Sequence, residues 1–400
     1  MKTPKISQRA KKVIASPIRK FLPLIRQAES RGVKVFKLNV GDPDLAVPPQ
    51  FMKAVKSYRL KTLGYAPSPG IAEHTAAWQK YYRQFGVALQ PQEIIPTVGG
   101  AEAIFLALQA VADPGDEIIV FEPLYTSYKS FSVMTGIKVV PVRLKVENNF
   151  TLPPQESIER RIGKRTRAIV VINPDNPTGK LWSRQELLTI VKIARKYGLF
   201  VICDETYREI RFSGRPFCLL SEKLARRHAI LVDSVSKRFS MPGARIGCVA
   251  SFNREVMQSI LKFAQARLSA GTLEQLATIS LLENSKIYTS KIKKEYQKRR
   301  DVVFKALKKM PGVVCHKPMG AFYLVAKLPV KNAEDFVKFM LRDFNYRKQT
   351  VMVTPMEDFY ITKGLGRSEI RIAYVLNTGE LKKAMEVLKK GLEAYPGRVR

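Results

Sequence analysis

Short, almost purely apolar runs alternate with segments of helical character between residues 94 and 250. We expect strands at residues 94–98, 117–121, 138–142, 168–172, 199–203, 229–232 and 245–250. Continuous Val, Ile and Leu character is typical of strands whose two faces are both covered by helices, as in a parallel sheet. The alternation therefore predicts an α/β fold, with a mostly parallel sheet flanked by helices in a large domain.

The two ends of the chain have a different character. Residues 1 to about 35 predict a basic arm and one amphipathic helix, and a short strand is expected at 35–40. Further segments predict helices at 47–63, 71–85, 253–310 and 333–344 and from Gly379, and strands at 321–327 and 369–374. A chain of 400 residues is long enough for two domains. We place an arm and part of the small domain at 1–45, a large domain at 46–300 and a smaller α+β domain at 301–400.

Composition limits the classes of function that we expect. The formal net charge is +35, but the basic residues are spread along the chain, which favours a generally cationic surface over specific nucleic-acid binding. No apolar run approaches the roughly 20 residues that cross a bilayer, and no secretory signal follows the basic start. We therefore expect a cytoplasmic protein with no membrane partner. Four cysteines without a CxxC pair and three scattered histidines favour neither a zinc site nor a His-based triad.

Glycines and polar residues follow several predicted strands. The turn Gly99–Glu102 precedes a helix, and both its glycines and the helix N-terminus suit an anion. Asn176 lies in a proline-rich loop after the strand at 168–172, and Asp204 ends the apolar run at 199–203. Ligands of open α/β sheets bind at this edge. A buried aspartate needs a cationic or hydrogen-bonding partner, although a helix N-cap is an alternative for Asp204.

Two basic residues lie in or shortly after predicted strands. Lys237 follows the run at 229–232, with Ser234 before it and Arg245 after it, and these neighbours suit a phosphate. A solvated loop lysine is the alternative. Strand alternation places Arg371 beside Ala373 on one face of a strand, which suits a bidentate clamp for a carboxylate. A surface arginine is the alternative there.

Taken in order, these stretches resemble the class I and II aminotransferases, fold-type I enzymes that use pyridoxal 5'-phosphate. The resemblance runs from about Asn39 to Tyr374. Asn176 precedes Asp204 by 28 positions, and Tyr207 follows Asp204 by 3. Each motif alone is weak or moderate, whereas the ordered set is specific. The large domain at 46–300 would then bind the cofactor.

The resemblance implies the catalytic roles. Lys237 would hold the cofactor as a Schiff base and carry the proton between Cα and C4′. Asp204 would pair with the protonated pyridine nitrogen. Tyr207 and Asn176 would donate to the phenolic oxygen of the cofactor, and Tyr125 would stack on its ring.

The resemblance also implies the binding groups. The cofactor phosphate would be held by Gly100, Ala101, Glu102, Ser234 and Arg245. Tyr65 would reach the phosphate from the neighbouring subunit, so that a homodimer shares its active sites. Arg371 would clamp the substrate α-carboxylate, helped by the Gly41 backbone and the Asn176 side chain.

The expected reaction is ping-pong transamination between an L-amino acid, aspartate or a similar one, and a 2-oxo acid, with 2-oxoglutarate as the expected acceptor. Ala101 replaces a lysine that some aspartate-specific relatives carry. Arg267 is the candidate for a second carboxylate, with a solvated helix arginine as the alternative. Three other functions stay open: an aromatic or broad-specificity aminotransferase, a carbon–sulfur lyase, and a DNA-binding regulator. Such regulators carry a winged-helix domain, for which about 35 residues before Val35 are too few.

Overall fold

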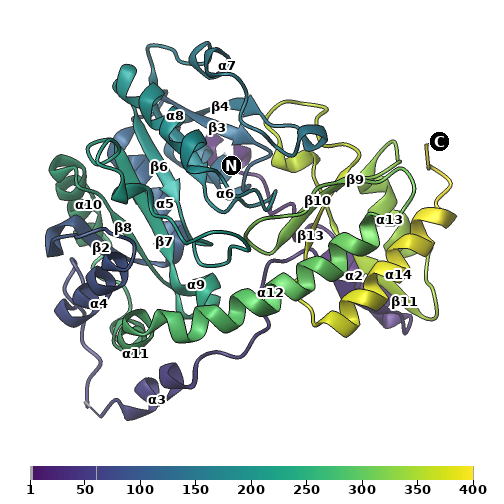
Figure 1. Cartoon of the computed structure of the whole chain (residues 1–400), viewed down its shortest axis with the longest axis horizontal. Coiled ribbons are helices and arrows are strands. Elements are labelled where there is room, and N and C mark those ends of the chain that lie inside the picture. Colours follow the sequence, from purple (N-terminus) through teal and green to yellow (C-terminus); the bar gives the residue numbers. More distant parts are fainter. Residues whose placement is uncertain (1–2, 60, 400) are drawn as a thin grey trace.

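The protein is described by a computed structural model that covers residues 3–59 and 61–399. Two parts, each with its own sheet, lie side by side, and the long helix α12 (Ser285–Leu307) extends along both (Figure 1). Within the described residues, no helix is long and apolar enough to cross a membrane.

The larger sheet has the strand order β2-β8-β7-β6-β5-β3-β4. Its strands are β2 (Ile94–Val98), β3 (Glu117–Glu122), β4 (Lys138–Arg143), β5 (Thr166–Ile172), β6 (Phe200–Asp204), β7 (Ala229–Ser234) and β8 (Ile246–Ala250). The neighbouring strands β4, β3, β5, β6 and β7 pair in parallel, whereas β8 runs antiparallel to both β7 and β2. The predicted α/β fold with a mostly parallel sheet is confirmed.

Both faces of this sheet are covered, which explains the continuous apolar runs. Successive residues of a strand point to opposite faces of the sheet and pack in different cores: Ile119 lies in one hydrophobic cluster and Ile118 in the other. The first cluster includes side chains of α4 (Ala72–Arg83), α8 (Arg184–Lys196) and α11 (Thr272–Glu283). The second includes side chains of α5 (Gly99–Val111), α6 (Ser127–Thr135) and α10 (Arg254–Ala266). A strand between two apolar layers has no polar face to alternate with.

The smaller part is built from both ends of the chain. Its antiparallel sheet has the order β12-β13-β10-β9. The strands of that sheet are β9 (Val314–Cys315), β10 (Tyr323–Lys327), β12 (Thr354–Pro355) and β13 (Glu369–Ala373). Nearby, β1 (Lys34–Lys37) pairs in parallel with β11 (Gln349–Met352). The core of this part includes side chains of α2 (Leu22–Ser30), α12, α13 (Ala333–Arg342) and α14 (Thr378–Ala394).

Residues 21–38 therefore pack with the C-terminal part of the chain. The domain boundaries near residues 45 and 300 stay a prediction; residues 1, 2 and 400, which fall in the predicted outer domains, lie outside the described residues. The short strands β9, β11 and β12 have two to four residues each, too few for a periodic sequence signal.

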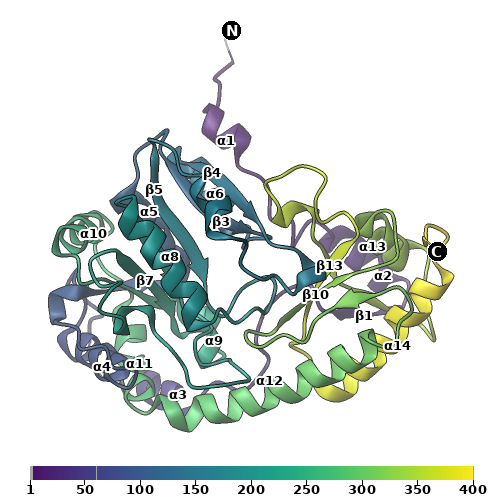
Figure 2. The same cartoon turned by 45° about the horizontal axis from the view of Figure 1, so that its top comes forward.

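Several predicted helices are shorter or divided. The helix expected at 47–63 is α3 (Pro49–Ser57), and residue 60 lies outside the described residues. The region at 253–310 is three helices. Leu268, with a positive φ of 78°, lies between α10 and α11, and Asn284, with φ −115° and ψ 28°, separates α11 from α12. The remaining helices are α1 (Gln8–Lys12), α7 (Gln155–Glu159) and α9 (Val235–Arg238). Figure 2 shows α1 projecting from the body of the molecule, close to the N-terminus.

Candidate active site

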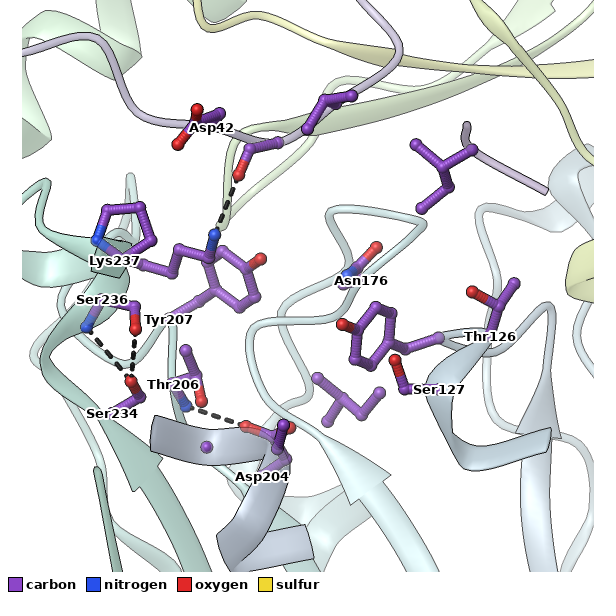
Figure 3. A pocket seen from close by; sticks show the side chains of 18 of the residues that line it. Asp42, Thr126, Ser127, Asn176, Asp204, Thr206, Tyr207, Ser234, Ser236 and Lys237 are labelled. Atoms are coloured by element: carbon purple, nitrogen blue, oxygen red, sulfur yellow. Dashed lines mark hydrogen bonds between the residues drawn. The ribbon is translucent and has the colours of Figure 1, made fainter. Parts of the chain in front are cut away.

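A cavity of about 490 Å³ lies where the loops after the parallel strands meet the smaller part. The predicted site residues that line it are Gly41, Gly100, Ala101, Tyr125, Asn176, Asp204, Tyr207, Ser234, Lys237, Arg245 and Arg371. Side chains that are far apart in the sequence therefore share one cavity (Figure 3).

Strand direction explains this convergence. The carboxyl ends of β5, β6 and β7 meet at one edge of the sheet. Asp204 is the last residue of β6, and Asn176 and Lys237 lie a few residues after the ends of β5 and β7. Because β8 runs the opposite way, its first residue lies at the same edge, and Arg245 stands directly before it. Arg371 comes from β13 of the smaller sheet. The cavity thus lies between the two sheets, at the edge where ligands of α/β folds bind.

Lys237 brings a buried amine to this cavity. It lies in the short helix α9, and its Nζ donates a hydrogen bond to the Gly41 carbonyl at 2.8 Å (Figure 3). Burial lowers the pKa of the Lys237 ammonium to about 8, and the positive charges of Arg371 and Arg245 act in the same direction, against Asp42. Near neutral pH a usable fraction of the amine is unprotonated, as a nucleophilic or proton-transferring lysine requires.

Asp204 is a buried carboxylate at the end of β6. Its Oδ1 accepts a hydrogen bond from the Thr206 amide at 3.1 Å, and among the described residues it forms no ion pair. Burial raises the pKa of Asp204 to about 6. A cationic group bound in the cavity would supply the missing partner and return the aspartate to its ionised form.

The opposite side of Lys237 offers a cradle for an anion. Gly100 is the second residue of the 13-residue helix α5, whose N-terminus carries unpaired amides. The Ser234 and Ser236 hydroxyl oxygens lie 2.7 Å apart, and both residues line the cavity. At Gly99 (φ +75°) an added Cβ would lie 2.5 Å from Arg245 Nη2, so a side chain there would displace the arginine. Amides, hydroxyls and a guanidinium together suit a phosphate.

Arg371 is a buried cation aimed at the cavity. Its Nη1 donates to Asn176 Oδ1 at 3.0 Å and its Nη2 to the Asn39 carbonyl at 2.7 Å, while its Nε has no hydrogen-bond partner among the described residues. Burial lowers the pKa of Arg371. None of the ion pairs between described residues includes it. Both partners of Arg371 are neutral, so its charge is left for an anionic ligand.

The family model for aminotransferases of class I and II matches residues 33–388. The chain belongs to this family. It is a transferase that depends on pyridoxal 5'-phosphate and moves amino groups between amino acids and 2-oxo acids.

Relatives of this aminotransferase carry different substrate names. It is 32% identical over 380 residues to the aspartate aminotransferase of Pyrococcus horikoshii, covering 92% of this chain and 94% of that relative. It is 33% identical over 376 residues to the aspartate/prephenate aminotransferase of Thermus thermophilus, covering 92% of each chain. The solved alanine aminotransferase of Pyrococcus furiosus superposes with a TM-score of 0.89 at 30% identity, covering 98% of this chain and all of that one.

The residues that line the cavity of this aminotransferase fit the cofactor. The unpaired, buried Asp204 suits the cationic ring nitrogen, and the cradle of Gly100, Ser234 and Arg245 suits the phosphate. Lys237 lines the same cavity, and its lowered pKa suits an amine that reacts with an aldehyde. These assignments of individual residues stay predictions.

Arg371→Lys is expected to weaken every amino-acid substrate of the aminotransferase together. A lysine ammonium is a point charge and cannot reproduce the planar fork that binds both carboxylate oxygens. We expect kcat/KM for aspartate and for alanine to fall by a similar factor, roughly 10- to 100-fold. Steady-state kinetics with the two amino acids measures this. Loss for only one of them would show that Arg371 binds a side chain instead.

A buried cluster of ion pairs includes residues on both sides of Lys237 in the sequence. Asp233 Oδ2 lies 2.9 Å from Arg208 Nη1, and its Oδ1 contacts Arg238. Arg208 also pairs with Glu205 at 2.6 Å, and the Tyr82 hydroxyl donates to Asp233 at 2.8 Å. The cationic arginines keep the pKa of Asp233 lowered despite its burial. Because Asp233 precedes and Arg238 follows Lys237, the cluster holds both ends of the turn that carries Lys237.

Asp233→Asn is expected to destabilise the aminotransferase by about 3 kcal/mol, because it leaves Arg208 and Arg238 buried with less negative charge between them. Denaturant unfolding followed by circular dichroism measures the change. The matched control is Asp335→Asn, an exposed aspartate 3.7 Å from Lys338, where the change should stay within about 1 kcal/mol. Equal effects of the two variants would mean that the cluster contributes no more than a surface pair.

Among the described residues that line the cavity, Glu102, Tyr65 and Arg267 do not occur. This differs from the prediction for Glu102 and Arg267, whereas Tyr65 was expected to reach the cavity of a neighbouring subunit. The Glu102 carboxylate accepts from the Val98 amide at 2.7 Å and lies 3.2 Å from Arg267 Nε. Arg267 also donates to the Pro96 carbonyl at 3.0 Å. The hypothesis that Arg267 binds a second substrate carboxylate is therefore wrong, because Glu102 already neutralises it outside the cavity.

Tyr65 is 84% exposed. A tyrosine that reaches a neighbouring subunit would be exposed in a single chain, so its predicted role is untested. The Glu102 side chain is engaged with Val98 and Arg267, which leaves only its backbone for the predicted phosphate contact.

The sequence analysis missed several residues of the cavity. Thr206 and Ser236 stand beside Asp204 and Lys237 in motifs that had been recognised, so their hydroxyls could have been included. Tyr323 shares a hydrogen bond with Tyr207, with the two hydroxyl oxygens 3.0 Å apart. No motif marks Tyr323, because it reaches the cavity through the pairing of β10 with β13. Arg19 also lines the cavity, and no signal in the sequence distinguished it from the other basic residues of the arm.

Proposed function

We propose that this aminotransferase takes the amino group from a dicarboxylic L-amino acid, aspartate or one like it, and transfers it to a 2-oxo acid, with 2-oxoglutarate as the acceptor. The observation that carries the amino-acid part of the proposal is the buried Arg371, held by neutral partners and lining the same cavity as Lys237. A fixed guanidinium in a cavity beside a reactive amine suits a substrate that carries a carboxylate next to its amino group. The names of two relatives, an aspartate aminotransferase and an aspartate/prephenate aminotransferase, support a substrate with a carboxylate in its side chain.

In this proposal, each residue has a task set by its position. Arg371 binds the α-carboxylate and orients the substrate, with Asn176 holding the guanidinium on its other side. Lys237, whose pKa is lowered to about 8, would move the proton from Cα of the amino acid to C4′ of the cofactor in the first half-reaction and from C4′ to Cα of the second substrate in the other. Pyridoxal 5'-phosphate, when bound, supplies the electron-withdrawing ring that makes this proton acidic. Asp204 would stabilise positive charge on the ring nitrogen, and the Tyr207 hydroxyl, which lines the same cavity, would donate a hydrogen bond to the cofactor.

The proposal includes a homodimer with shared active sites. The Tyr65 side chain is 84% exposed in the single chain, as a residue that reaches into a neighbouring subunit would be. Sedimentation at micromolar concentration would test this assembly, and a monomer with full activity would contradict the shared site. The cytoplasmic location expected from the sequence stays a prediction.

A second candidate is an aminotransferase for small or aromatic side chains. The similarity to a solved alanine aminotransferase favours it, and so do Ile18 and Val40, apolar residues that line the cavity. The carbon–sulfur lyase alternative would release pyruvate and ammonia without an added oxo acid. The DNA-binding regulator has no support in these comparisons, in which the relatives are named as aminotransferases.

A panel of half-reactions tests the proposal. Holoenzyme is mixed with each amino acid in turn, and the absorbance change to the amine form of the cofactor gives a rate. Aspartate or glutamate should convert the cofactor at least tenfold faster than alanine, phenylalanine or cysteine at equal concentration. Faster conversion with alanine or phenylalanine would replace the dicarboxylic assignment, and pyruvate formed from cysteine without an oxo acid would indicate a lyase.

A further inference from the structure

Within the described part of the chain, the basic side chains that line the cavity are Arg19, Lys237, Arg245 and Arg371. Three of them have tasks in the proposed function: proton transfer, binding of the phosphate and binding of the α-carboxylate. Arg19 has none. Its side chain enters no hydrogen bond or ion pair with the described residues, and it is exposed to solvent.

The backbone around Arg19 is firmly held. The Ile18 carbonyl accepts a hydrogen bond from Asn39 Nδ2 at 3.0 Å, and the Arg19 amide donates to the Ser16 carbonyl at 3.0 Å. The next residue, Lys20, forms ion pairs with two carboxylates of the smaller part, and Phe21 is buried in the core of that part. Every neighbour of Arg19 is anchored, so a fixed backbone presents a free guanidinium to the cavity.

The same residue, Asn39, connects this segment to the α-carboxylate clamp. Its side chain holds the Ile18 carbonyl, and its own carbonyl accepts from Arg371 Nη2 at 2.7 Å. Asn39 is buried, and its carbonyl also accepts from the Thr354 hydroxyl at 3.1 Å. The positions of Arg19 and Arg371 are thus set by one common support.

We propose that Arg19 binds the distal carboxylate of a dicarboxylic substrate while Arg371 binds the α-carboxylate, and that Arg19 determines the preference for this substrate class. The inference rests on the proposed function and names the residue that sets its specificity. Two guanidinium groups on one cavity are complementary to two carboxylates on one small molecule. Ala101 offers no charge, and Arg267 is engaged with Glu102 outside the cavity, so neither can take this task.

The test compares Arg19→Gln and Arg19→Lys with wild-type holoenzyme. The matched control is Arg26→Gln, which removes the same charge from an exposed position on α2, outside the described cavity lining. Each protein is assayed with aspartate and alanine. Binding of maleate, a dicarboxylate that cannot react, and of butyrate, which has one carboxylate, is measured by calorimetry.

Arg19→Gln should lower kcat/KM for aspartate and the affinity for maleate by roughly 10- to 100-fold, with alanine and butyrate changed by less than about threefold. Arg19→Lys should recover part of the loss, and Arg26→Gln should resemble wild type. If wild type prefers aspartate and Arg19→Gln keeps that preference, the role of Arg19 is overturned and the proposed function stands. If wild type prefers neither aspartate over alanine nor maleate over butyrate, the role of Arg19 and the proposed dicarboxylic substrate are both overturned. Equal losses with aspartate and alanine would make Arg19 a structural residue.

Discussion

Lys237→Ala is expected to abolish turnover while the fold stays intact. The amine is the one basic group of the described cavity whose pKa, lowered to about 8, permits proton transfer near neutral pH. Methyl in place of the amine leaves no group to move the proton at Cα, and we expect a fall of about 10⁴-fold or more in kcat. Stopped-flow and steady-state assays with aspartate measure the loss, and circular dichroism checks the fold.

The control is Lys305→Ala, which removes an exposed lysine of α12 far from the cavity and should leave turnover unchanged. Added methylamine should restore a little activity to Lys237→Ala, because the cavity left by the side chain can admit a small amine. Substantial turnover without added amine would remove Lys237 from the proposed chemistry.

Asp204→Asn is expected to bind the cofactor but to lose roughly 10³-fold in kcat, which corresponds to about 4 kcal/mol of transition-state stabilisation. The amide keeps the shape of the side chain but cannot balance positive charge on the ring nitrogen. Asp175→Asn is the control, since Asp175 is a buried aspartate of a neighbouring loop that bonds to Thr178 and lies outside the described cavity lining. Within the described residues no helix begins at Asp204, so near-normal turnover of Asp204→Asn would leave Asp204 only the task of holding the turn after β6 through the Thr206 amide.

The same variant has a second readout, the stability of the cofactor-free protein. Because burial raises the pKa of Asp204 to about 6, the folded protein holds a proton that the unfolded chain has lost between about pH 4 and 6. Wild type should therefore lose stability as pH rises through this range, relative to Asp204→Asn. Urea unfolding of the two proteins at pH 4.5 and pH 6.5 measures the difference. An equal change in both would show that Asp204 ionises in the folded protein as freely as in water.

The sequence was sufficient to predict a residue of the cavity where that residue lies at the end of a buried strand. Asp204 and Lys237 come directly after buried apolar runs, and parallel strands end at a common edge, so their meeting could be expected. Tyr323 could not be found in this way, because its place depends on how β10 pairs with β13. Arg267 was misjudged for a related reason: spacing along the chain does not show that Glu102 lies opposite it.

The features of the fold that have a local sequence pattern could also be predicted, whereas those that depend on pairing between distant segments could not. Apolar runs with helices between them predicted the larger sheet, since strands of five to seven residues between two cores carry a strong pattern. The antiparallel direction of β8 was not predictable from its composition, which matches that of its neighbours. The pairing of β1 with β11 joins residues more than 300 positions apart, and no local pattern of the chain encodes such a partner.

The pairing of β1 with β11 also fixes an order of events during synthesis. Residues 21–38 leave the ribosome first, yet their partners at 349–352 and 370–388 come last. At 5 to 20 residues per second, the start of the chain waits roughly 15 to 60 seconds for them. Meanwhile the larger sheet, whose strands all lie between residues 94 and 250, can already close. The nascent chain would therefore carry Lys237 and Asp204 on a formed sheet before Arg371 exists, with the apolar face of α2 open to chaperones.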